Sequence, residues 1–172
     1  SETSLRRNRM SLDSLAFRPR ICRDVSEINT ATDFFGHGLR IPVILAPMGG
    51  IERFSPNGAN DVDDAAHAFG SVNFISTVTQ PSLEEIAANS DHAKVFQIYV
   101  RGDDDWIRDL VRRVVKAGYA GVTLTVDSAF YGNRERLNPA QLALRRVAAR
   151  DWQKKITWDT VKLIQDEIGD IP

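Results

Sequence analysis

Four short apolar segments, each followed by a segment with helical features, place the strongest constraint on how this chain can fold. The apolar segments lie at residues 41–47, 72–75, 95–100 and 122–126. Their first residues are about 23 to 30 positions apart, which is enough chain for a helix to connect two neighbouring parallel strands. The sequence therefore predicts an α/β fold in which strand and helix alternate four times.

Helix-start signals follow the predicted strands. Helices are expected over 61–69, from Ser82 onward, from Asp103 onward and over 158–168. Ser82 precedes two glutamates and Thr157 precedes the last helix, so both are predicted N-caps. The run Asp103–Asp105 admits a metal site, but we favour helix capping because carboxylates suit the positive end of a helix.

Polar side chains gather at the ends of the later strands. Ser76 follows the second strand, Gln97 and Tyr99 alternate with apolar residues on the third, and Thr125 and Asp127 end the fourth. The carboxyl ends of parallel strands meet at one edge, where a β/α barrel builds its active site. We therefore expect the first four units of a (β/α)8 TIM barrel. No strand is followed by Gly-x-Gly-x-x-Gly, which disfavours a dinucleotide-binding Rossmann fold.

Composition narrows the class of protein. The 172 residues are 42% hydrophobic and 26% charged, with a formal net charge of -1, so no global field attracts nucleic acid or an anionic membrane. The single cysteine, Cys22, cannot form an internal disulfide. Neither a transmembrane-length apolar run nor a signal peptide is evident. We expect a cytoplasmic protein, with peripheral membrane association left open.

The domain organisation is expected to be a single barrel half. Residues 1–40 form a lead-in segment whose first part, within 1–23, is a basic helix, and residues 41–172 hold the four units. Residues 137–155 are expected to form a surface loop with a helical piece. The chain starts at Ser1 rather than Met, and Gly169–Pro172 resembles a loop leading into another strand. We therefore expect a fragment of a larger polypeptide.

Several strings resemble the family of FMN-dependent 2-hydroxy-acid oxidases and dehydrogenases, which includes glycolate oxidase, lactate oxidase and mandelate dehydrogenase. Among them are Ile-Pro-Val-Ile-Leu-Ala-Pro, Phe-Gln-Ile-Tyr-Val and Leu-Thr-Val-Asp-Ser. The matching strings lie at 5–8, 17–26, 41–47, 82–87, 96–100 and 124–128. They cover nearly the whole chain in the family's order. The resemblance implies an FMN-binding eight-stranded β/α barrel.

The resemblance also implies a flavin site. The backbone of Pro47, Met48 and Gly49 would lie against the flavin ring near its reactive nitrogen. The side chains of Ser76, Gln97 and Thr125 would bind the polar edge of the ring.

Three further residues would serve the substrate and the base. The resemblance implies that Tyr99 directs its hydroxyl at the substrate and that Arg134 grips the substrate carboxylate, for which a guanidinium fork is suited. Asp127 would orient a catalytic histidine and stabilise its charged form, as a buried carboxylate at a strand end.

Other parts of the family pattern have no counterpart here. The base histidine, the flavin-contacting lysine of the fifth strand and the phosphate site belong to later strands, and an upstream substrate tyrosine would precede Ser1. His37, His67 and His92 do not occupy the family's histidine position and are interpreted as structural or surface residues. Met48–Gly49 stands where many members have Thr-Ala, and Val78 where some have an aromatic residue, so the substrate pocket is expected to differ.

The expected function is FMN-dependent oxidation of an L-2-hydroxy acid such as lactate to the 2-oxo acid. The 172 residues alone are expected to be inactive, so the missing parts would come from a C-terminal half or a second polypeptide. A homo-oligomer is expected from the family. Two alternatives remain: another FMN-barrel enzyme of the diphosphate isomerase type, and a non-catalytic half-barrel that serves as an assembly partner.

Overall fold

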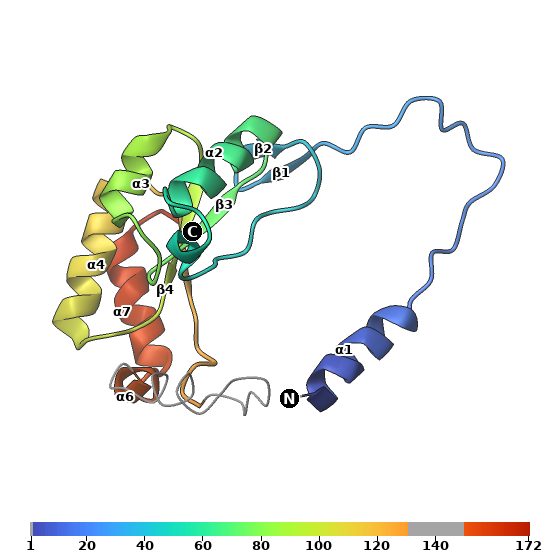
Figure 1. The fold of residues 1–172 in the computed structure, drawn as a ribbon. Coiled ribbons are helices and arrows are strands. Elements are labelled where there is room, and N and C mark those ends of the chain that lie inside the picture. The colour runs from blue at the N-terminus through green and yellow to red at the C-terminus, as the bar shows by residue number, and fades with distance from the viewer. Residues whose placement is uncertain (1, 131–149) are drawn as a thin grey trace. The chain divides into compact units, whose positions relative to one another are not determined.

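A computed structural model describes residues 2–130 and 150–172 of the chain (Figure 1). The chain divides into two compact units, Ser1–Asn29 with Phe130–Ala148, and Thr30–Ala129 with Ala149–Pro172. The second unit carries the sheet and most of the residues that the sequence analysis assigned to a site.

In the first unit, the predicted basic helix is confirmed as α1, Glu2–Asp13. No residue of α1 is buried, and its apolar residues Leu5, Met10 and Leu12 are exposed. Arg9 forms an ion pair with Asp13 one turn later, which is the favourable spacing for opposite charges on a helix surface.

The second unit is built on a parallel three-stranded sheet. Its strands are β3 (Asn73–Ser76), β4 (Lys94–Ile98) and β5 (Gly121–Leu124), in the order β3-β4-β5. Ser76 lies opposite Gln97, and Ile98 opposite Leu124. The last three predicted strands and their parallel pairing are therefore confirmed.

The first predicted strand, residues 41–47, is wrong in its extent. Among the described residues, Leu45 alone of this segment pairs, in a single parallel bridge with Asn73. Its amide donates to Val72 O and its carbonyl accepts from Phe74 N, both at 3.0 Å. Pro42 and Pro47 flank this bridge and have no N–H to donate, so they interrupt a longer ladder.

An antiparallel hairpin that the sequence analysis did not predict lies within the lead-in segment. It joins β1 (Thr32–Phe34) to β2 (His37–Leu39). Phe35 and Gly36, between the strands, both have positive φ, of 49° and 81°. The amide of Gly36 donates to the Asp33 carboxylate at 3.0 Å. His37 is thus a strand residue rather than a loop residue.

The predicted helices and their N-caps are confirmed. They are α2 (Ala59–Phe69), α3 (Leu83–Asn89), α4 (Asp104–Lys116) and α7 (Trp158–Ile168). Ser82 and Glu85 form a reciprocal capping box, the Asp103 carboxylate accepts from Trp106 N at 3.0 Å, and the Thr157 hydroxyl accepts from Asp159 N. Two further short elements lie in the described ranges: η1 (Ile51–Arg53), and α6 (Arg150–Gln153), the helical piece expected within 137–155.

The main core lies between the sheet and the helices α3, α4 and α7, which stand on one side of it (Figure 1). Alternation along β4 directs Phe96 and Ile98 toward these helices, so Gln97 points to the opposite face of the sheet. Across the described ranges, no helix has the length and apolar character needed to cross a membrane.

Two helices of this layer are joined by charge. Glu167 on α7 accepts hydrogen bonds from Arg108 at 2.5 Å and from Arg112 at 2.9 and 3.2 Å, both on α4. Hydrogen bonds from Arg108 and then Arg112 lower the pKa of the Glu167 carboxyl below its usual value of 4.5. A separate pair joins α4 to α3, where Arg113 binds Glu84 at 2.7 and 3.1 Å.

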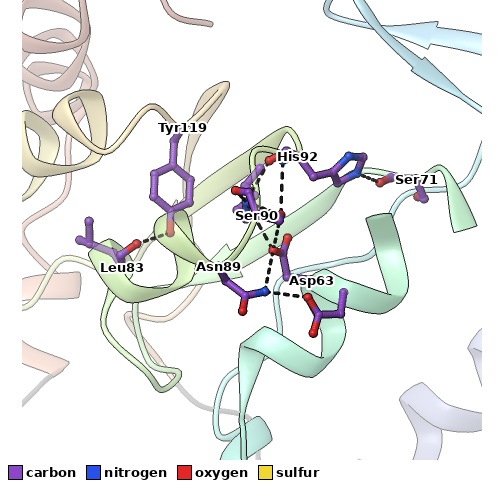
Figure 2. Close-up of polar contacts among 9 residues, drawn as sticks. Asp63, Ser71, Leu83, Asn89, Ser90, His92 and Tyr119 are labelled. Carbon is purple, nitrogen blue, oxygen red and sulfur yellow. Dashed lines mark hydrogen bonds and ion pairs between the residues drawn. The ribbon is translucent and has the colours of Figure 1, made fainter. Parts of the chain in front are cut away.

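A buried polar cluster lies at the amino end of β4 (Figure 2). Asp63 of α2 is fully buried, and its carboxylate accepts from Ser90 Oγ at 2.8 Å and lies 3.4 Å from the Lys94 ammonium. Lys94, also buried, donates to the carbonyls of Ser90 and His92 at 2.7 and 3.0 Å. Since a buried charge is costly without a partner, this pair ties α2 to the start of β4.

Tyr119, between α4 and β5, bonds to the first residue of α3 (Figure 2). Its hydroxyl donates to Leu83 O at 2.9 Å, and its ring meets Phe96 edge-on at 5.3 Å. Burial raises the pKa of the Tyr119 phenol above its usual value, so the residue stays a neutral hydrogen-bond donor.

Replacing Asp63 by asparagine should destabilise the fold. The amide keeps the shape of the side chain but leaves Lys94 buried without a counter-charge, so we expect the free energy of unfolding to fall by about 3 kcal/mol. Urea denaturation followed by circular dichroism measures this. Asp64→Asn is the matched control, because Asp64 is exposed on the same helix and accepts one bond from Asn89 at 2.7 Å. Equal losses in the two variants would contradict the assignment.

The Glu167 cluster should make stability depend on pH in the acid range. Folding lowers the pKa of Glu167. The stabilisation that its ionised carboxylate gives the fold is therefore present above pH 4.5 and is lost as the pH falls through the lowered value. Glu167→Gln should therefore be less stable at neutral pH and lose less stability between about pH 5 and pH 3. Asp166→Asn, the exposed neighbour on α7, should keep the wild-type pH dependence. Denaturant titrations at several pH values measure this. A wild-type pH dependence in both variants would refute the role of Glu167.

Candidate functional site

Three of the predicted cofactor-binding side chains form one hydrogen-bonded row across the sheet. Ser76 Oγ donates to Gln97 Oε1 at 2.7 Å, and Gln97 Nε2 donates to Thr125 Oγ1 at 2.5 Å. Ser76 and Gln97 are buried, with Gln97 only 2% exposed, and Thr125 is half-buried. The row follows from the strand pairing: Ser76 lies opposite Gln97, and Thr125 directly follows β5, two residues beyond the register partner of Gln97.

The row presents both donors and acceptors. Ser76 Oγ has given its hydrogen to Gln97, so its lone pairs remain available, and Val78 N approaches them at 3.4 Å. Thr125 accepts from Gln97 and keeps its own hydroxyl hydrogen. Gln97 has a second amide hydrogen. A flat heterocycle with alternating carbonyl and N–H groups at its edge is the kind of ligand that such a row can bind.

Tyr99 lies two residues beyond Gln97 on the same chain segment and is half-buried. Its amide donates to the Thr77 hydroxyl at 3.1 Å. Within the described part of the chain, its phenol hydroxyl has no hydrogen-bond partner. Because Tyr99 follows Gln97 by two residues, strand alternation places its side chain on the same face of the sheet as the row.

The Pro47–Gly50 turn contacts Val78, two residues after the end of β3. Gly50 N donates to Val78 O at 3.0 Å, and Gly50 has a φ of 75°. A Cβ added at Gly49 would lie 2.5 Å from Val78 Cγ2 and 3.2 Å from Val78 O, so only glycine fits there without movement. Pro47, Met48 and Gly49 are exposed, which leaves the backbone of the turn accessible.

Two predicted site residues are not joined to this group. Asp127 follows β5 and is exposed, and its carboxylate accepts from Ser128 Oγ at 3.3 Å. The carboxylate that was expected to be buried is thus exposed in the part of the chain that the structure describes. Arg134 lies outside the described residues.

The three histidines have local environments of their own. His92 Nε2 contacts Ser71 O, and the rings of His67 and His92 stack with centroids 4.9 Å apart. His37 belongs to β2. In the described ranges, no group of three or more His, Cys, Asp or Glu side chains is arranged to hold a metal.

The sequence analysis assigned no role to Thr77. Its hydroxyl donates to Gln97 O at 2.5 Å and accepts from Tyr99 N. The available signal was its place: it directly follows Ser76, at the point where β3 leaves the sheet and a hydroxyl can replace a backbone partner.

Comparisons with known proteins agree with this geometry. The model of the FMN-dependent dehydrogenase family matches residues 1–165. Glycolate oxidase 3 of Oryza sativa subsp. indica is 36% identical over 157 residues, covering 88% of this chain and 43% of that protein. Glycolate oxidase of Spinacia oleracea is 34% identical over 132 residues, covering 77% and 36%.

Solved structures give the same result. A mandelate oxidase structure with benzoyl-formic acid matches with a TM-score of 0.85 and 32% identity, covering all of this chain and 52% of that one. Another mandelate oxidase structure is described as holding a C4a-OH-FMN adduct. This chain thus spans about half the length of these relatives, and the predicted partial TIM barrel is confirmed. The chain belongs to the FMN-dependent dehydrogenase family.

Proposed function

We propose that this protein oxidises an L-2-hydroxy acid to the 2-oxo acid with FMN as cofactor. The observation that carries the proposal is the row Ser76–Gln97–Thr125 with Tyr99 beside it, at the carboxyl ends of parallel strands. This edge is where β/α barrels place their chemistry. The family membership supplies the reaction class.

The residues present fit the flavin. Its pyrimidine edge alternates carbonyl oxygens with ring nitrogens, and the row offers a free hydroxyl donor at Thr125, an amide hydrogen at Gln97 and lone pairs at Ser76. The accessible backbone at 47–49, kept close to Val78 by the missing Cβ of Gly49, offers a surface for a flat ring. FMN, when bound, accepts the electron pair that leaves the substrate.

Tyr99 and Arg134 are proposed to hold the substrate. The solved mandelate oxidase structures include variants in which a tyrosine was changed to phenylalanine and an arginine to leucine. Those two positions are separated by the same number of residues as Tyr99 and Arg134. In our proposal the Tyr99 hydroxyl bonds the substrate's oxygen and Arg134 pairs with its carboxylate.

Asp127 is proposed to orient the histidine that takes the substrate's proton. Its exposed carboxylate is free to meet a side chain from outside the described residues. A carboxylate beside an imidazole fixes the tautomer and stabilises the protonated ring.

The wider setting is also proposed. Since the chain spans about half of its relatives, the histidine and phosphate site would come from a C-terminal half or a second polypeptide. Lactate is one candidate substrate, and glycolate and mandelate are the others that the relatives suggest. A homo-oligomer located in the cytoplasm is the arrangement we propose.

Flavin spectra and substrate reduction test the function. The protein, purified with any polypeptide that accompanies it and identified by intact mass, should carry FMN that L-lactate, glycolate or L-mandelate bleaches without oxygen. Arg134→Lys should lower kcat/KM by about tenfold or more, because lysine cannot form a bidentate pair with the substrate carboxylate. Arg112→Lys, on the outer helix α4, should stay within about twofold.

Two results would refute this proposal. Bound FMN that no 2-hydroxy acid reduces would favour a diphosphate isomerase type of enzyme. An accompanying polypeptide without any flavin would favour a non-catalytic assembly partner.

A second prediction concerns the row itself. Gln97→Leu keeps the size of the side chain but removes both bonds of the row, so FMN retention should weaken about tenfold or more. Gln153→Leu is the control: Gln153 is also buried, and its Nε2 donates to Val100 O at 2.6 Å, outside the row. Flavin fluorescence during dilution measures the release. Equal loss of flavin from both variants would refute the assignment of the row.

A further inference from the structure

The Thr77 hydroxyl makes two hydrogen bonds to one short stretch of β4. It donates to the carbonyl of Gln97 at 2.5 Å and accepts from the amide of Tyr99 at 3.1 Å. The backbone amide of Thr77 also donates to the Gln97 carbonyl, at 2.9 Å. The Thr77 side chain thus binds the backbone at both ends of the segment 97–99.

This arrangement replaces a regular backbone bond. In a regular parallel ladder, a residue bonds two residues of the neighbouring strand that are two positions apart. Its amide donates to the carbonyl of the first, and its carbonyl accepts from the amide of the second. The Thr77 amide donates to Gln97 O, so its carbonyl would be the regular acceptor for Tyr99 N. The hydroxyl accepts that bond instead, while the backbone turns away through Val78 and Thr79, whose amide bonds Ser76 O at 3.2 Å.

The segment 97–99 joins two parts of the candidate site. Gln97 has its side chain in the polar row, and Tyr99 is the proposed substrate-binding phenol. Alternation directs both side chains to the same face of the sheet. The backbone between them therefore determines where the phenol lies relative to the cofactor-binding row.

We propose that Thr77 is a positioning residue that holds Tyr99 in register with the flavin-binding row. It touches neither substrate nor flavin in this role and acts through the backbone of Tyr99. The inference rests on the proposed function for its catalytic consequence, but the contact between Thr77 and Tyr99 can be tested without cofactor or substrate.

Amide hydrogen exchange tests the contact. In Thr77→Val the methyl group occupies the place of the hydroxyl, so the Tyr99 amide should exchange about tenfold faster than in wild type. Thr77→Ser keeps the hydroxyl and should restore protection. The amide of Thr125, bonded to Ile98 O, is an internal control and should stay within about twofold. Unchanged Tyr99 exchange in Thr77→Val would overturn the proposal.

A double-mutant cycle tests the catalytic consequence. Thr77→Val should lower kcat for flavin reduction by L-mandelate, L-lactate or glycolate about tenfold, and Thr77→Ser should recover most of it. In a Tyr99→Phe background, Thr77→Val should change kcat less than about twofold, because its effect acts through the phenol. If the two substitutions instead lowered kcat independently, so that the double variant showed the product of their separate effects, the proposal would be overturned. Failure of the unaltered protein to oxidise any of the three acids would instead overturn the proposed function.

Discussion

The parallel pairing of β3, β4 and β5 is the constraint on which the candidate site depends. Parallel strands run in the same direction, so their carboxyl ends coincide, and the register places Ser76 directly opposite Gln97. A slip of one residue would turn Gln97 to the helix side and break the row. The positions of the row, of Thr77 and of Tyr99 are therefore consequences of one alignment between strands.

That alignment is secured at the other end of the same strand. The buried pair of Asp63 and Lys94 anchors the amino end of β4, three residues before Gln97. Phe96 and Ile98 hold the intervening segment against the helix layer. The buried ion pair and the candidate site thus lie at opposite ends of a single short strand, as expected of a barrel architecture.

The sequence was sufficient for the features that depend on local pattern. Apolar alternation predicted β4, capping residues predicted the starts of α3, α4 and α7, and strand ends predicted the row. It was insufficient where pairing depends on distant partners. The segment 41–47 looks like a strand, yet only Leu45 finds a partner in the described residues, and nothing in its own composition reveals that.

The remaining misses have similar causes. The hairpin of β1 and β2 is only a few residues long, so its alternation is too short to detect. Asp127 was expected to be buried because it follows an apolar strand, but strand composition does not determine where the chain turns after its last pair. The proposed role of Thr77 depends on a hydroxyl taking the place of a carbonyl, and its place after Ser76 suggests but does not determine that exchange.

The contact between Gly49 and Val78 has a consequence for how this site can diversify. The turn and the strand end share one small volume, since even a methyl group at Gly49 would overlap the valine. A side chain introduced at Gly49 alone would therefore have to displace Val78 or the turn itself. Any redesign of the pocket at this point has to treat the two positions and the backbone that carries them as one unit.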